Sequence, residues 1–558
     1  MTYAAPLNDL LFNIAYIAGG GADPELAAAV LGELGRFCAE EIAPLNASGD
    51  RTGSVCTGGV VHTAPGFREA YAQFVAMGWQ GLCHPEAFGG QGLPRVMGAA
   101  ASEILNAANM SFALCPLLTD GAIEALRHFG DEEMKAAYLP HLVAGRWTGT
   151  MNLTEPQAGS DLALLRSRAE GQTDGTYAIT GTKIFITYGE HDLAENIVHL
   201  VLARTPDAPK GIKGISLFLV PKVLPDGARN RVTCQSIEHK LGVRASPTCV
   251  LEFDGATGFL IGQENSGLDY MFTMMNAARF AVGVQGVAIA DRATQQATSY
   301  AKARIQGRPV DGSSSAAVAI IHHPDVRRML GQMRATTEAC RSLAAYAAGL
   351  QDQGDTALAE FLVPLVKGYC TEMAVQVAST AVQIHGGAGF IEETGAAQHY
   401  RDARILPIYE GTTAIQANDL LGRKTLRDDG TTARRLAAMI AATEGELLSG
   451  ANDLQDIAGL LTASRLDFEA AAAHLLTAEP NAAFAGSVPF LMLAGNLVAG
   501  WQMARAALAA QGALQTDPTF MTAKIATARF HAQHILPDTA LQRARILNGA
   551  DSLLSMTF

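Results

Sequence analysis

The feature that most constrains the fold is a change of periodicity in the middle of the chain, between residues 150 and about 265. Short runs of β-branched, aromatic and aliphatic residues replace helical patterns there, and loops rich in Pro, Gly, Asp and Asn separate the runs. They are Tyr177–Thr180, Lys183–Thr187, Val198–Leu202, Ile215–Val220 and Cys249–Phe253, and the first two flank an expected turn at Gly181. Several short strands at this spacing predict a small antiparallel barrel or sandwich.

Helical periodicity dominates on both sides of these strands. Near the start, Asp23 is the expected N-cap of an amphipathic run, with Pro24 at its first helical position. After the strands, the long run Met271–Arg304 carries Gly283 and Gly286, where another helix could approach closely. Further helices are expected around 324–351, 355–383 and 413–423, which would complete an antiparallel bundle. An Ala-rich helical stretch follows a polar break at 427–430.

These changes predict a mainly α protein with a central β domain and four parts, since 558 residues exceed one ordinary domain. The parts are an N-terminal helical domain with an extension (1–149), the central β domain (150–266), a helical bundle (267–428) and an additional C-terminal helical domain (429–558).

Composition narrows the classes of function. Hydrophobic residues make up 49% and charged residues 17% of the chain, which is enough for a large buried core. A net charge of −13 without a dense Lys/Arg tract disfavours binding to nucleic acid or anionic membranes. Eight cysteines without a CxxC pair are expected to be reduced core thiols, not a disulfide frame or a metal site. The N-terminal residues carry no signal-peptide pattern, so we expect a cytoplasmic protein.

One segment raises the question of a membrane span. Asn481–Met503 contains no charged residue, so a spanning helix of about 20 apolar residues is one interpretation. Pro489, Asn496 and Gln502 dilute its apolarity, which favours the alternative, a buried helix in an Ala-rich bundle.

Two segments could bring backbone groups close to a ligand. Pro156 and Gly159 force a tight loop within Met151–Asp161, where short hydroxyl side chains stand beside backbone N–H groups. Gln383–Phe390 contains three glycines at the end of an expected helix. Taken alone, the two segments are better explained as an ordinary polar turn and a helix C-cap.

A third segment, Arg401–Thr413, contains a carboxylate in an unusual context. Glu410 follows an apolar run and precedes Gly411. Thr413 and Gln416 have the spacing of a capping box, and either Thr412 or Thr413 could cap the next helix. A carboxylate in an apolar cleft has a raised pKa, as a proton-abstracting base requires. The alternative is an acidic residue at a helix start, stabilised by the helix dipole.

Together the segments resemble one family, the acyl-CoA dehydrogenases. MNLTEPQAGSD, YAITGTKIFIT, QIHGGAGF and RDARILPIYEGTTAIQ occur in the order and approximate spacing of that family, over roughly residues 30 to 425. Other stretches, including NAANMSFALCPLL and IIHHPDVRRML, are similar to the 3-methylmercaptopropionyl-CoA dehydrogenase branch, as is the tail after about residue 430. The resemblance implies a helical N-terminal domain, a small β-barrel and a four-helix bundle, followed by a C-terminal helical domain.

The resemblance implies Glu410 as the catalytic base and non-covalent FAD as the cofactor. The implied FAD contacts are Met151, Leu153, Thr154, Gly159, Ser160, Phe185, Ile186, Thr187, Arg304, Gln383, Gly386, Gly387 and Thr412. The implied substrate contacts are Ser160, Asn276, Arg279, Tyr409 and Gly411, and no metal is expected. The family often has Trp at Phe185 and Asp at Asn276, and the insertion Asp311–Ala319 departs from simpler relatives.

The implied reaction is α,β-dehydrogenation of an acyl-CoA to the trans-2-enoyl-CoA, with electrons passed to an electron-transfer flavoprotein. The branch points to 3-methylmercaptopropionyl-CoA or a short-chain acyl-CoA as substrate. Arg304 and Gln383–Gly387 would serve the FAD of a neighbouring subunit, which implies a homo-oligomer, with a dimer favoured. Two alternatives remain open: an acyl-CoA oxidase, and a DNA-associated flavoprotein of this fold, which the acidic composition disfavours.

Overall fold

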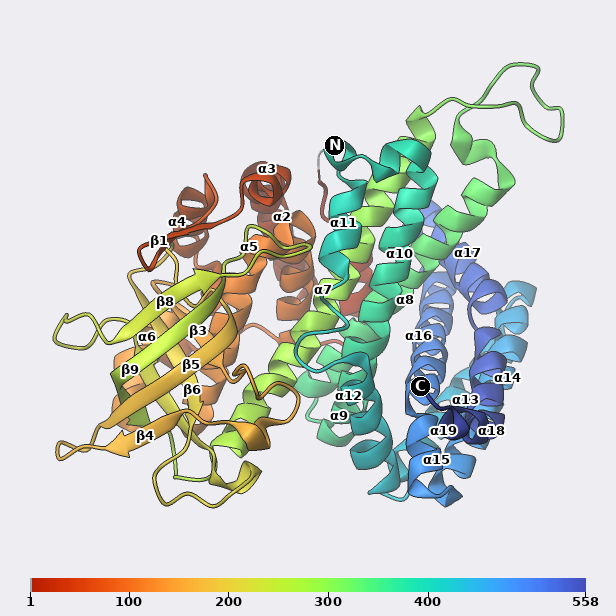
Figure 1. Cartoon of the computed structure of the whole chain (residues 1–558). Helices are drawn as coiled ribbons and strands as arrows, with labels where there is room; N and C mark the ends of the chain where they lie inside the picture. The colour runs from red at the N-terminus through yellow and green to blue at the C-terminus, as the bar shows by residue number, and fades with distance from the viewer. Residues whose placement is uncertain (1–2) are drawn as a thin grey trace. The chain divides into compact units, whose positions relative to one another are not determined.

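The computed structural model describes residues 3–558, which divide into two units, each assembled from separate segments (Figure 1). The sheet unit contains Phe37–Leu93 and Ala108–Ala278. The bundle unit contains the described residues up to Arg36, Pro94–Ala107 and Arg279–Phe558.

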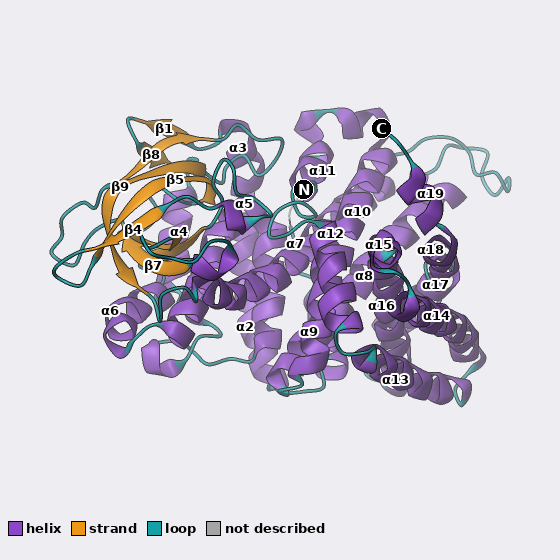
Figure 2. Ribbon diagram, turned by 60° about the horizontal axis from the view of Figure 1, so that its bottom comes forward, coloured by secondary structure: helices purple, strands orange, loops and turns teal. Residues whose placement is uncertain are grey.

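A seven-stranded sheet is the centre of the sheet unit (Figure 2). Its strands are β3 (Trp147–Asn152), β4 (Arg168–Gly171), β5 (Tyr177–Thr187), β6 (Asn196–Ala203), β7 (Ser216–Pro221), β8 (Val232–Ile237) and β9 (Thr248–Leu260). They follow the order β3-β6-β7-β9-β5-β4, and β8 also pairs with β9. The expectation of a purely antiparallel sheet was wrong, because β3 pairs parallel with β6.

The expected turn at Gly181 was also wrong, since β5 runs unbroken from Tyr177 to Thr187. Gly181 has a φ of +150°, and a Cβ there would lie 2.3 Å from Oγ of Ser167. Its glycine therefore permits a close approach within the sheet and does not reverse the chain.

Helices and a small hairpin complete the sheet unit. The hairpin of β1 (Val55–Thr57) and β2 (Val60–His62) interrupts a region in which only helices were expected. The helices are α3 (Pro44–Thr52), α4 (Phe67–Ala76), the second part of α5 (Arg95–Phe129) and α6 (Glu132–Val143). The long helix α5 is kinked at Asn109, whose side-chain oxygen accepts a hydrogen bond from the N–H of Phe112 at 3.1 Å.

Long helices form the bundle unit. They include α2 (Pro24–Phe37), α7 (Gly267–Ala303), α8 (Pro324–Asp352), α9 (Thr356–Pro364) and α10 (Cys370–His385), and a π-helical turn, η8 (Leu365–Tyr369), joins α9 to α10. Asp23 caps α2 as predicted, accepting from the N–H of Leu26 at 2.8 Å. The loop between α7 and α8 contains the 311–319 insertion and extends away from the helices (Figure 1).

The predicted close approach at Gly283 and Gly286 is confirmed. A Cβ at Gly283 would lie 2.4 Å from the Val366 side chain, and one at Gly286 would lie 2.9 Å from the Cys370 carbonyl oxygen. The missing side chains on α7 therefore let the η8–α10 segment approach it backbone to backbone.

The C-terminal helices pack onto this bundle. They are α13 (Thr431–Leu448), α14 (Asn452–Thr477), α15 (Pro480–Ala485), α16 (Ser487–Gly512), α17 (Pro518–His534), α18 (Asp538–Asn548) and α19 (Ala550–Ser555). The uncharged segment from Asn481 lies largely in α16, which packs against α8, α14 and α17 and is mostly buried. No helix within residues 3–558 combines the length and apolarity needed to cross a bilayer.

Candidate active site

Glu410 lies in a strained turn between α11 (Ala396–Ala403) and α12 (Thr413–Asn418). Its φ is +53°, and the φ of Gly411 is +88°, so two successive residues adopt left-handed backbone conformations. A residue with a Cβ adopts that conformation at a cost of about 1–2 kcal/mol. Such strain persists only where surrounding contacts hold it, and it is concentrated at functional sites.

The start of α12 differs from the expected capping box. Thr412 is the N-cap, and its Oγ1 accepts from the N–H of Ile415 at 3.4 Å. The side chain of Gln416 turns back and donates to the carbonyl oxygens of Glu410 at 3.2 Å and Gly411 at 3.3 Å. It stabilises the strained turn and not the helix start.

Burial raises the pKa of the half-buried Glu410 carboxyl, whereas the nearby cations Arg279 and Lys367 lower it. Arg279 is buried on α7, and its Nη1 lies 3.7 Å from a carboxylate oxygen of Asp419. The predicted base and the predicted substrate residue Arg279 are therefore near enough for the charge of one to affect the pKa of the other.

The residue before Glu410 is fixed by a chain of amides. The hydroxyl of Tyr409 donates to the side-chain carbonyl of Gln285, whose amide donates to Oδ1 of Asn106 at 2.9 Å. Gln285 is fully buried, and Asn106 in turn donates to the carbonyl of Ser102 at 2.8 Å.

Lys367 and Glu372 complete this side of the site. The ammonium of Lys367 donates to the carbonyl oxygen of Gly411 at 2.5 Å, and Oγ1 of Thr413 donates to Glu372 at 2.5 Å. The sequence motifs did not reveal these two residues or Gln285. The available signal for Lys367 was its position as a single cation at the end of the apolar run 361–366.

In the sheet unit, the predicted flavin loop is held against β5. The N–H of Ile184 donates to the Thr154 carbonyl at 3.0 Å, and the Lys183 ammonium donates to the Leu153 carbonyl at 3.1 Å. Lys183 also pairs with the buried Glu155 at 2.8 Å. Burial alone would raise the pKa of Glu155, but Lys183 and hydrogen bonds from Ser167 and Arg166 lower it to about 2.

The far end of β5 and the loop tip are open. Phe185 has a φ of +59° and is 59% exposed, whereas Ile186 is buried and Thr187 is half-buried. Ser160 and Gly159 are exposed, and a Cβ at Gly159 would meet nothing within 4 Å. Met151 is buried at the end of β3, and Asn276 is exposed on the part of α7 that belongs to this unit.

The remaining predicted flavin residues lie together in the bundle unit. Gly386 has a φ of +61° and ends α10, and a Cβ at Gly386 or Gly387 would meet nothing within 4 Å. His385 stacks on Tyr300 with ring centroids 4.3 Å apart, which joins this end of α10 to the end of α7. Arg304 follows α7 directly and, like Gln383, is exposed.

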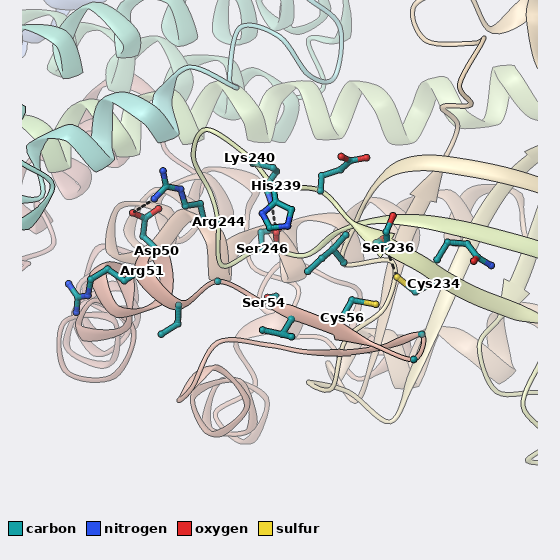
Figure 3. A pocket seen from close by; sticks show the side chains of 18 of the residues that line it. Asp50, Arg51, Ser54, Cys56, Cys234, Ser236, His239, Lys240, Arg244 and Ser246 are labelled. Carbon is teal, nitrogen blue, oxygen red and sulfur yellow. Dashed lines mark hydrogen bonds and ion pairs between the residues drawn. The ribbon is translucent and has the colours of Figure 1, made fainter.

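The sheet unit also contains a cavity of about 990 Å³ (Figure 3). Its walls come from the 50–59 segment, from β8 and the residues after it, and from Arg244 and Ser246. Arg244 lies 3.9 Å from Asp50, and Lys240 donates to the Ser246 carbonyl at 2.7 Å. The predicted flavin and substrate residues lie outside these walls.

Comparison with known proteins identifies the class to which this fold and site belong. Models of the acyl-CoA dehydrogenase N-terminal, middle and C-terminal domains match residues 24–146, 150–256 and 265–426. A model described as acetyl-CoA dehydrogenase C-terminal like matches residues 433–557. The chain belongs to the acyl-CoA dehydrogenase family.

Individual relatives show which members of the family this chain is similar to. It is 59% identical to 3-methylmercaptopropionyl-CoA dehydrogenase of Ruegeria pomeroyi over 100% of both chains. The structure of butyryl-CoA dehydrogenase from Megasphaera elsdenii is similar with a TM-score of 0.63 and 27% identity, covering 72% of this chain and 98% of that one. A Bacillus anthracis acyl-CoA dehydrogenase complexed with FAD has a TM-score of 0.79 and 22% identity, covering 98% of this chain and 91% of that one, and shows the same fold.

These matches confirm several predictions from the sequence. The chain has the fold of the family with an added C-terminal helical domain, and it is an enzyme of acyl-CoA dehydrogenation. Family membership also confirms FAD as the cofactor and an acyl-CoA as the substrate.

Proposed function

We propose that the chain oxidises 3-methylmercaptopropionyl-CoA, or a short acyl-CoA of similar length, with Glu410 as the base. The observation that carries the assignment of Glu410 is its half-buried carboxyl, whose pKa is raised by burial, on a strained turn beside Arg279 and Lys367. The full-length similarity to 3-methylmercaptopropionyl-CoA dehydrogenase supports the substrate.

Each group at this turn has a role in the proposed reaction. The backbone N–H of Glu410 would donate to the thioester carbonyl and so acidify the neighbouring α-C–H bond. The Glu410 carboxylate would accept the α-proton, and its raised pKa makes it a stronger base than an ordinary glutamate. Arg279 and Tyr409 would orient the substrate, the latter fixed by Gln285.

The residues fit a flavin. An exposed aromatic face at Phe185 and the half-buried hydroxyl of Thr187 suit the flat ring, and the open loop tip at Gly159 and Ser160 suits a pyrophosphate. Gly386 and Gly387 leave space where a ligand can reach the backbone. When bound, FAD supplies the acceptor for the hydride that leaves the β-carbon.

We further propose the partners and surroundings implied by the family. An electron-transfer flavoprotein would reoxidise the enzyme in the cytoplasm. Exposed Arg304, Gln383 and Gly386–Gly387 would contact the FAD of a second copy, which makes a homodimer the proposed assembly.

A substrate panel under anaerobic conditions tests the proposal. FAD-loaded protein is mixed with 3-methylmercaptopropionyl-, butyryl-, hexanoyl- and palmitoyl-CoA, and loss of flavin absorbance is followed. The thioether and the C4–C6 substrates should bleach at rates within about 200-fold of one another, because an apolar pocket separates near-isosteres by only ~1–3 kcal/mol. Fast bleaching by palmitoyl-CoA alone would overturn the short-chain assignment.

A further inference from the structure

Lys367 occupies a position where a cation is costly. It lies in the π-helical turn η8, and its side chain is 0% exposed. Its neighbours along the chain, Val366 and Tyr369, are also fully buried. Burying an ammonium is unfavourable unless it is paired, and single π-helical turns often mark functional positions. Packing alone therefore does not explain why a lysine occupies this buried position.

The direct partner of the ammonium is the site turn itself. Lys367 donates to the Gly411 carbonyl at 2.5 Å, one residue beyond Glu410. This direct contact is to a backbone carbonyl and not to a carboxylate. The buried cation is thus compensated by a backbone carbonyl and by the longer-range field of nearby acids.

Few other charges act on this pair. Arg279 on α7 also faces Glu410, but it is 3.7 Å from Asp419, which in turn lies 3.7 Å from Arg423. Glu372 on α10 attracts Lys367 and accepts the Thr413 hydroxyl hydrogen bond. The charge of Arg279 is therefore partly neutralised by a neighbour, whereas that of Lys367 is directed mainly at Glu410 and Glu372.

We propose that Lys367 is a positioning residue for dehydrogenation, which fixes the left-handed Glu410–Gly411 turn and places a positive charge beside the Glu410 carboxylate. The inference rests on the proposed role of Glu410 as the base. It explains how a strained turn stays in one conformation, since Lys367 and Gln416 together hold its two carbonyls.

The electrostatics of the pair support this role. Burial lowers the pKa of Lys367 to about 7, and the charge of Glu410 opposes that shift. Lys367 in turn lowers the pKa of Glu410, against the effect of burial. Each group thus favours the ionised form of the other, and an ionised Glu410 is the form that can accept a proton.

Two substitutions separate the hydrogen bond from the charge. Lys367→Met has similar length but neither donor nor charge, and Lys367→Gln keeps a donor without charge. The matched control is Lys524→Met, which removes another buried lysine from the bundle unit, one bonded to Asp9 and Glu338. All variants are compared as FAD-loaded protein at a temperature below their own melting midpoints. The rate at which the acyl-CoA substrate bleaches the flavin is measured under anaerobic conditions at a series of pH values.

Lys367→Met should lower the maximal bleaching rate roughly 10- to 100-fold with little change in substrate affinity, because the base is misplaced. In both Lys367 variants the acid limb of the pH–rate profile should move to higher pH, since a positive charge beside Glu410 is lost. Lys367→Gln should recover part of the rate but not the position of the limb. Lys524→Met should leave rate and limb as in the wild type.

A second readout does not depend on turnover. Infrared difference spectra between wild type and Glu410→Gln isolate the protonated carboxyl band of Glu410, and its titration should shift upward in both Lys367 variants. Should the methionine variant fail to fold, the glutamine variant carries both pH tests.

The outcomes separate the two proposals. If Glu410→Gln bleaches at the wild-type rate, the role of Glu410 fails and the inference fails with it. If Glu410→Gln is inactive while the Lys367 variants keep the wild-type limb and carboxyl titration, only the role of Lys367 is overturned.

Discussion

The ammonium of Lys524, on α17 of the C-terminal helices, donates to the carboxylate of Glu338, on α8 of the bundle, at 2.8 Å. The same ammonium also binds Asp9, and Arg341 joins Asp9 to Glu103 and Asp291. This buried network connects five parts of the chain that are distant in sequence. Its charged groups compensate one another, so removing one leaves its buried partners with less compensating charge.

We predict that Lys524→Met lowers the free energy of unfolding by about 3 kcal/mol, the lower end of the range for breaking a buried pair. The loss stays at that end because Arg341 still neutralises Asp9 and Arg334 still binds Glu338. Denaturant unfolding measures it. Lys424→Met, which removes a partly exposed pair with Glu360, should cost less than ~1 kcal/mol. Equal losses in the two variants would contradict the importance of burial.

Glu410→Gln should abolish most of the reductive half-reaction. General-base catalysis is worth about 10²–10⁴-fold, and the loss should reach the upper end because hydride departure depends on the same proton transfer. FAD content should barely change and the melting temperature should not fall, since the amide fills the same volume. If Glu410 were only a helix-start acid, turnover would stay normal and stability would fall by about 0.3–1 kcal/mol. Anaerobic bleaching and thermal melting distinguish the two.

The raised pKa of Glu410 also predicts how its stability contribution depends on pH. A carboxyl whose folded pKa lies above its unfolded value stabilises the fold while protonated, and that contribution is lost as pH rises through the folded value. Glu410→Gln should therefore unfold less readily than wild type at neutral pH, and the difference should shrink below about pH 4. Denaturation midpoints at both pH values test this, and a difference that grows on acidification would contradict it.

Gly283→Ala should destabilise the bundle by about 1–3 kcal/mol, because the added methyl would overlap Val366 and force α7 away from η8. It should also slow bleaching, since η8 carries Lys367. Gly459→Ala in α14 is the matched control: a Cβ there meets nothing within 4 Å, so stability should rise by up to ~1 kcal/mol. Unfolding and bleaching are measured on both variants.

The sequence predicted what depends on local pattern. The caps at Asp23 and Thr412, the glycine approach on α7 and the succession of helices and strands follow from short-range rules. Gly181 was wrongly predicted to form a turn, because the sequence alone does not distinguish a glycine needed for close packing from one needed for a turn. Gln416 was wrongly predicted to complete a capping box. It has the required spacing, but its side chain donates to the preceding turn.

Long-range partnership could not be predicted from these patterns. Lys367 and Gly411 are 44 residues apart, and Tyr409 and Gln285 are 124 apart. Neither pair follows a helical or strand period, so only the packing of α7, η8 and the Glu410 turn brings them together. The motifs predicted the candidate base but not the residues that hold it.

The contact between α16 and η8 gives the C-terminal helices a further meaning. A Cβ at Gly495 would lie 2.3 Å from the Tyr369 side chain, and one at Gly368 would lie 2.6 Å from Leu491. Gly368, which follows Lys367, thus packs against α16. Deleting the C-terminal helices would expose the surroundings of Lys367 to water. The added helices therefore support the active site by covering η8. An enzyme without them would need other residues to bury this segment before it could reach the same rate.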